Sequence, residues 1–130
     1  MKGVVPVAIA LLVAGRPEAH AVWAAAVCGH IFPITRRFRG GKGVATAGGG
    51  GLVLSPLLAL AMAALFFAIV RLGRVAALGS LAIAIVYPLT IWLLGRPSIE
   101  VVISIALAVV VIFRHRGNLE RLMRRSEATV

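Results

Sequence analysis

The chain has 130 residues, of which 61% are hydrophobic, and its formal net charge is +10 at pH 7. Soluble domains carry roughly 45–50% apolar residues, so this composition excludes an ordinary soluble fold and indicates an integral membrane protein. The excess of cations is then explained first by topology and by contact with anionic membrane lipids, and we expect no nucleic-acid partner. The single cysteine and the three histidines show no metal-ligand spacing, so we expect no metal and no cofactor.

Five apolar runs follow one another along the chain, and we expect them to form membrane helices. They are residues 4–14, 19–34, 44–70, 75–94 and 99–113. The third run is longer than the ~20 residues that a single span needs. Ser55-Pro56 lies near its middle, and proline interrupts a helix because it lacks the N–H donor.

The distribution of Lys and Arg decides whether the third run crosses the membrane once or twice. A single crossing divides these residues six against eight between the two faces. A turn at Ser55-Pro56 divides them twelve against two, with only Arg16 and Arg96 outside. The strong bias favours about six segments with both termini in the cytoplasm. We therefore expect an all-α polytopic helical bundle, with 1–130 as one membrane domain, 114–130 as a basic cytoplasmic tail, and the motif loops on the cytoplasmic face.

The glycine loop, residues 36–43, is the most informative segment. It places Arg36, Arg37, Arg39 and Lys42 around Gly40, Gly41 and Gly43. Glycine permits positive φ and brings backbone amides close to a ligand, and a helix expected from Val44 would direct its N-terminal amides at the loop. This pattern predicts an anion site, for which phosphate is the best candidate. It is not a Walker A loop, because Arg36 and Gly43 occupy the positions that need Gly and Ser or Thr. The alternative is a positive-inside turn that glycine merely bends.

The last apolar run ends in the sequence RHRGNLERL, residues 114–122. His115 is expected where the apolar bundle meets water, and an imidazole there can exchange protons with a substrate. If the helix continues, Arg114, Asn118 and Arg121 share one face. The alternative is a basic cap that binds lipid headgroups. His115 and Asn118 fit that alternative poorly, because neither adds charge at neutral pH.

Three motifs, GHIFP at 29–33, FRGGKGVAT at 38–46 and RHRGNLERL at 114–122, resemble those of the PlsY-type glycerol-3-phosphate acyltransferases of bacterial membranes. The likeness runs over nearly the whole chain. It implies transfer of an acyl group from acyl-phosphate to the 1-hydroxyl of glycerol 3-phosphate, which yields lysophosphatidic acid. It also implies a monomer in the bacterial inner (plasma) membrane with its active site facing the cytoplasm.

The resemblance also implies roles for individual residues. The phosphate-binding set is Arg39, Gly40, Gly41, Lys42, Gly43, Ser80 and Arg116, and the catalytic set is Lys42, His115 and Asn118. The alternative role for Ser80 is that of an ordinary serine that caps a helix. His30 is either an acid–base group or a structural hydrogen-bonding residue under the loop. No Ser-His-Asp set is evident, so we expect direct transfer without an acyl-enzyme.

This chain departs from the family pattern in three places. The family has an additional N-terminal helix and a first loop with Ser-Gly-Asn and Gly-Ala-Thr-Asn patterns, which have no counterpart here. We therefore expect an N-terminal truncation before Met1 and a chain that folds yet transfers acyl groups weakly or not at all by itself. Ala77 stands where the family has a serine, and Arg125 stands where it has a glycine.

Two rival hypotheses remain, a catalytically inactive membrane fragment and a small transporter. A transporter needs polar groups through the bilayer depth. The expected spans offer mainly Thr46, Ser55, Thr90 and Ser104.

Overall fold

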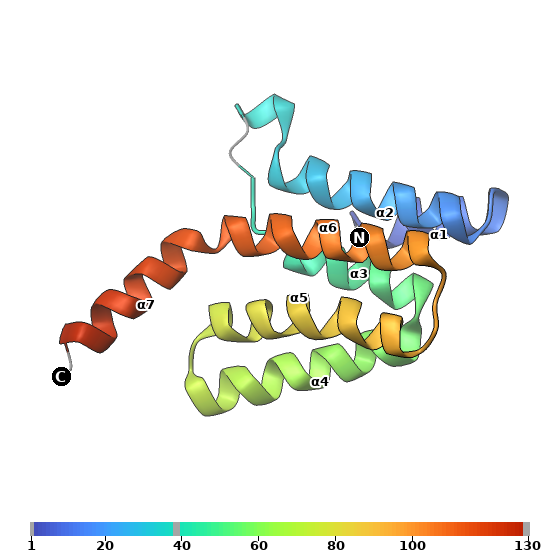
Figure 1. The fold of residues 1–130 in the computed structure, drawn as a ribbon. Coiled ribbons are helices and arrows are strands. Elements are labelled where there is room, and N and C mark those ends of the chain that lie inside the picture. Colours follow the sequence, from blue (N-terminus) through green and yellow to red (C-terminus); the bar gives the residue numbers. More distant parts are fainter. Residues whose placement is uncertain (1, 38–39, 129–130) are drawn as a thin grey trace.

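The computed structural model describes residues 2–37 and 40–128, with side chains up to residue 124. Its helices are α1 (Val4–Val13), α2 (Arg16–Ile31), α3 (Val44–Leu54), α4 (Pro56–Gly73), α5 (Ala76–Leu93), α6 (Ser98–Arg114) and α7 (Arg116–Ala128), and a 3-10 turn, η1, covers Ile34–Arg36. The described residues contain no strand. The predicted all-α helical bundle is thus confirmed (Figure 1).

The third apolar run breaks where the sequence predicts. α3 ends at Leu54, Ser55 adopts a non-helical conformation with φ −150°, and α4 begins at Pro56. Proline suits the first helical position, because its φ is already helical and its missing N–H would have no partner there. The run therefore forms two helices that meet at a sharp turn.

The helices differ in how far they could reach across a membrane. Within the described chain, α4 and α5 are each long and apolar enough to cross, and α6 with α7 forms a third such unit bent by 49°. α1 and α3 are apolar but shorter. Crossing by these two short helices remains a prediction that depends on tilt or on local thinning of the bilayer.

The bundle places α3 and α6 between two helix pairs. The α4–α5 hairpin packs on one side and the α1–α2 pair on the other, while α7 projects away from the end of α6 (Figure 1). A buried apolar cluster joins α1, α2, α3 and α6 through Val7, Ala19, Trp23, Val27, Ile31, Leu54 and Leu107. The short helices are therefore held by packing rather than by their own length.

Two of the four consecutive glycines at 48–51 allow close packing of helices. A Cβ on Gly50 would overlap the ring of Trp23, and a Cβ on Gly49 would lie 3.1 Å from Val4. The Trp23 indole N–H also donates to the Ala47 carbonyl over 3.0 Å. α2 and α3 can approach this closely because Gly50 has no side chain.

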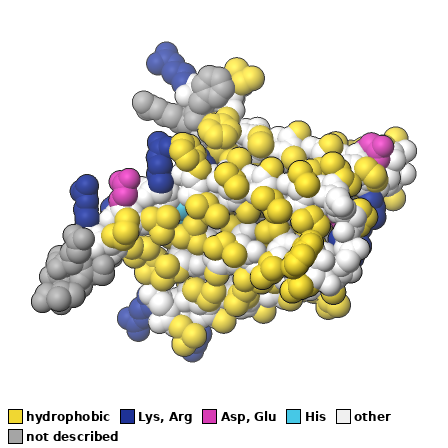
Figure 2. Space-filling view, in the orientation of Figure 1, with side chains coloured by type: hydrophobic (Ala, Val, Ile, Leu, Met, Phe, Trp, Pro, Cys, Tyr) yellow, Lys and Arg dark blue, Asp and Glu magenta, His cyan; other side chains and the backbone are white. Residues whose placement is uncertain are grey.

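The outer surface is apolar. Leu12, Leu57 and Leu72 are more than four-fifths exposed, at 87%, 83% and 87%. Figure 2 shows hydrophobic side chains covering the visible flank, with Lys and Arg gathered toward its ends. A surface of this kind is stable against lipid and not against water, as expected of an integral membrane protein.

A partly buried ion pair closes the end of the bundle that lies farthest from the glycine loop. Arg16 donates to both carboxylate oxygens of Glu100, over 3.0 and 3.3 Å, and to the Leu54 carbonyl over 2.8 Å. These contacts tie the start of α2 to the end of α3 and the start of α6. Arg16 therefore lies at the opposite end from Lys42, as the predicted charge partition requires.

Candidate active site

Four residues singled out in the sequence meet at one end of the bundle. His30 lies in the last turn of α2, Lys42 lies in the glycine loop, Ser80 lies near the start of α5, and His115 follows α6. All four line one cavity of about 550 Å³. Its remaining walls are Gly43, Val44, Ala45, Phe66, Phe67, Ala76 and Ala77. The glycine loop, the α4–α5 turn and the end of α6 thus converge, as predicted.

The start of α3 gives this cavity a positive character. Gly43 precedes the helix with φ 79°, a left-handed conformation that glycine adopts without strain. The first backbone amides of an α-helix have no partner within the helix, and they carry the positive end of its dipole. Those of Val44 and Ala45 belong to residues in the cavity wall. Together with the ammonium group of Lys42, they make a site suited to an anion such as phosphate.

The other glycines of the loop also meet a packing requirement that the sequence did not indicate. Positive φ occurs at Gly43 and not at Gly41. A Cβ on Gly40 would overlap the backbone of His30 and Ile31, and a Cβ on Gly41 would lie 2.5 Å from Nε2 of His30. These two glycines therefore allow the loop to lie directly on the end of α2. Arg39, the other predicted ligand of this loop, lies outside the described residues.

His115 is the buried imidazole of the site, with 1% of its surface exposed. Its Nδ1 lies 2.8 Å from the Val111 carbonyl oxygen, which can only accept a hydrogen bond. This contact assigns the hydrogen of a neutral ring to Nδ1, so Nε2 is left as the nitrogen that can accept a proton. His115 therefore has the tautomer that a general base requires.

The helix does not continue straight through the last motif. α6 ends at Arg114, and α7 leaves at an angle of 49°. Arg116 is exposed, with its guanidinium 4.2 Å above the Phe113 ring, and neither Arg116 nor Asn118 lines the cavity. The structure thus brings His115 to the site and leaves these two predicted residues outside its wall.

Ser80 and His30 keep both of their alternatives. The Ser80 hydroxyl donates to the Ala76 carbonyl over 3.1 Å, which leaves its oxygen free to accept a bond from a ligand. Ala77, where the family resemblance expects a serine, lines the same cavity. The His30 ring lies against Gly41 under the loop, as a structural role requires, and it also faces the cavity.

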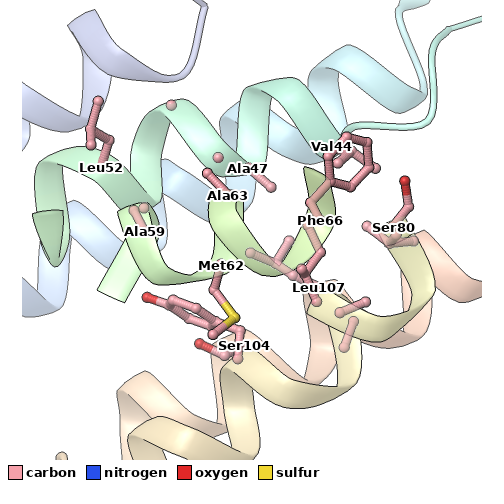
Figure 3. Close-up of a pocket in the computed structure, with 18 of the residues that line it drawn as sticks. Val44, Ala47, Leu52, Ala59, Met62, Ala63, Phe66, Ser80, Ser104 and Leu107 are labelled. Carbon is pink, nitrogen blue, oxygen red and sulfur yellow. The ribbon is translucent and has the colours of Figure 1, made fainter. Parts of the chain in front are cut away.

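A second, apolar cavity of about 400 Å³ adjoins the first and was not predicted from the sequence. The two share Val44, Phe66, Phe67 and Ser80 in their walls. Figure 3 shows Leu52, Ala59, Met62 and Ser104 farther along this apolar cavity. Small residues on facing helices, among them Ala59 and Gly48, leave the space open. The sequence shows such residues but does not tell whether the gap between them is filled.

Comparisons with known proteins identify the family of this chain. A family model described as glycerol-3-phosphate acyltransferase matches residues 1–125. Proteins of that name from Syntrophotalea carbinolica, Rubrobacter xylanophilus and Myxococcus xanthus are 42%, 39% and 43% identical over 98% of this chain. The matches cover 66%, 64% and 67% of those relatives, so the chain spans about two thirds of their length.

Solved structures of related proteins have the same fold as this chain. Two crystal structures of PlsY (YgiH), described as an integral membrane glycerol 3-phosphate acyltransferase, superpose with TM-score 0.89 at 32% identity. One is its glycerol 3-phosphate form and the other its lysophosphatidic acid form. They cover 94% of this chain, which covers 62% and 63% of theirs. The chain belongs to the glycerol-3-phosphate acyltransferase family.

Proposed function

We propose that this chain provides the acyl-transfer site of a glycerol-3-phosphate acyltransferase, which moves an acyl group from acyl-phosphate to glycerol 3-phosphate. The observation that carries the proposal is the cavity lined by Lys42, the start of α3 and His115, which shares wall residues with an apolar cavity. An anion site, a proton acceptor and an apolar site are the three features that this reaction needs. The enzyme acts as a monomer in the bacterial inner membrane, with this end of the bundle and the tail, 114–130, in the cytoplasm.

Phosphate recognition falls to the glycine loop and its surroundings. Lys42 and the amides at the start of α3 bind the phosphate and offset the charge that grows on the leaving phosphate during transfer. Arg39, Gly40, Gly41, Gly43 and Ser80 complete the proposed set around them. For Arg116 and Asn118 the proposal rests on the family resemblance, because neither lines the cavity.

The chemical step is a direct displacement at the acyl carbonyl. The 1-hydroxyl of glycerol 3-phosphate attacks the carbonyl carbon of the acyl-phosphate, and its proton passes to Nε2 of His115 or to a phosphate oxygen of the substrate. The bond between the carbonyl carbon and the phosphate oxygen then breaks. The products are lysophosphatidate and inorganic phosphate. No Ser-His-Asp set occurs among the described cavity residues, which favours this route over an acyl-enzyme.

The apolar cavity accommodates the acyl chain. Ala63 lines it and faces its interior in Figure 3, so Ala63→Trp would fill part of the space. We expect this variant to lose long acyl-phosphates more than short ones as substrates. Equal losses for short and long chains would contradict the assignment.

Acyl transfer tests the proposal directly. Purified protein is incubated with palmitoyl phosphate and radiolabelled glycerol 3-phosphate, and labelled lysophosphatidate is counted. Because this chain lacks parts of the family pattern, we expect weak but detectable product from the unaltered chain. Lys42→Ala and His115→Ala should lose this product, and Arg121→Ala should keep it, because Arg121 is exposed on α7. Product that survives Lys42→Ala would refute the anion site. Binding of glycerol 3-phosphate without any product would favour the rival hypothesis, a catalytically inactive membrane fragment.

A further inference from the structure

We propose that Arg114 is a positioning residue that holds the glycine loop in the shape that binds phosphate. The inference rests on the proposed function of that loop and adds a residue to it. The sequence suggested no contact between Arg114 and the loop, which are separated by more than 70 positions. The geometry brings them together at the wall of the cavity.

The contact is a hydrogen bond from α6 to the loop backbone. Nη2 of Arg114 donates to the Gly40 carbonyl over 3.2 Å. Within the part of the chain that the structure describes, no other side chain donates to the glycine loop. The backbone of Gly40, Gly41 and Lys42 likewise makes no hydrogen bond to other described backbone groups. Arg114 is therefore the polar tether of this segment.

The loop segment that Arg114 holds also packs against the end of α2. Gly40 lies on the backbone of His30 and Ile31, so closely that a Cβ would not fit. The loop is thus held between the end of α2 on one side and Arg114 on the other. Lys42 follows two residues later, so displacement of Gly40 would also displace the ammonium group from the cavity.

The environment of Arg114 favours arginine over lysine. Its guanidinium also lies over the ring of Phe32, at 5.9 Å from the centroid. Its Nε is buried and makes no hydrogen bond with the described residues. A planar guanidinium can contact a carbonyl and an aromatic face at once, whereas an ammonium is a compact point donor. Because His115 is the next residue, Arg114 also fixes the loop relative to the proposed base.

The rate of cleavage by a lysine-specific protease measures directly how often the glycine loop opens. The chain has only two lysines, Lys2 and Lys42, so one internal cut reports opening of the glycine loop. Arg114→Met removes the donor and keeps an apolar stem. Arg121→Met is the matched control, because Arg121 also donates to a backbone carbonyl, that of Gly117, but within its own helix.

We expect the ligand-free Arg114→Met protein to be cut at Lys42 at least fivefold faster than the unaltered protein. Arg121→Met should match the unaltered protein, and Arg114→Lys should fall between the two. Thermal unfolding in detergent shows whether each variant is folded. Should Arg114→Met not fold, the comparison of Arg114→Lys with Arg121→Met decides. Equal cutting of the folded Arg114 variants and the control would overturn the inference.

Glycerol 3-phosphate supplies a second readout that a merely structural role would not change. Bound ligand should protect Lys42, and a folded Arg114→Met protein should need about tenfold more of it for equal protection. Unchanged protection in that variant would contradict the positioning role. No protection in the unaltered protein would refute the proposed function instead, and the cutting rates without ligand would still decide the role of Arg114.

Discussion

Gly43→Ala is the substitution whose effect can be worked out most fully from the structure. Gly43 has φ 79°, and a left-handed conformation costs an L-residue about 1–2 kcal/mol. Its new Cβ would also lie 2.7 and 2.9 Å from Cδ1 and Cγ1 of Ile31, which is fully buried and cannot swing away. The loop must therefore carry the strain or shift. If the loop shifts, the backbone cost of about 1–2 kcal/mol by itself lowers the affinity for phosphate about 5- to 30-fold, since each 1.4 kcal/mol is a factor of ten.

Two measurements separate these outcomes. Thermal unfolding in detergent reports strain that the fold retains, and titration with glycerol 3-phosphate reports a loop that has moved. Gly29→Ala is the control, because Gly29 lies in α2 with open space around its Cβ position, and alanine favours a helix by up to about 1 kcal/mol. A Gly43→Ala protein with normal stability and normal affinity would refute the reasoning.

Three further changes test other parts of the account. Ala77→Ser adds a hydroxyl to the cavity wall and should tighten glycerol 3-phosphate binding about two- to tenfold, the worth of one neutral hydrogen bond; weaker binding in a titration would contradict this. Glu100→Gln should lower the thermal midpoint in detergent by weakening a partly buried ion pair worth about 1–3 kcal/mol, and an unchanged midpoint would show that the pair adds nothing. In a Cys28→Ser background, a membrane-impermeant thiol reagent applied to intact cells should label Arg96→Cys and spare Arg71→Cys, and the reverse pattern would invert the proposed topology.

Features set by local chemistry could be predicted from the sequence. Ser55-Pro56 splits the long apolar run because proline acts on its own and neighbouring backbone, whatever surrounds it. The start of α3 at Val44 follows from Gly43 in the same way. The charge partition placed the loops of Lys42, Ser80 and His115 at one end, because it counts residues and needs no tertiary contact.

Features set by contact between distant segments could not be predicted. Arg114 and Gly40, like Arg16 and Glu100, meet only because whole helices pack in a particular register. The glycines of the loop suggested positive φ, but the sequence did not show that Gly40 lies in close contact with α2. The apolar cavity depends on how far apart facing helices lie, a distance that no local pattern specifies.

Titration of the purified chain with glycerol 3-phosphate tests the central claim most directly. Calorimetry should give one saturable site per chain that inorganic phosphate competes for. The site should be lost in Lys42→Ala and retained in Arg121→Ala, because Lys42 lines the cavity and Arg121 does not. An absence of binding, or binding that Lys42→Ala leaves unchanged, would contradict the assignment of this cavity as the glycerol 3-phosphate site.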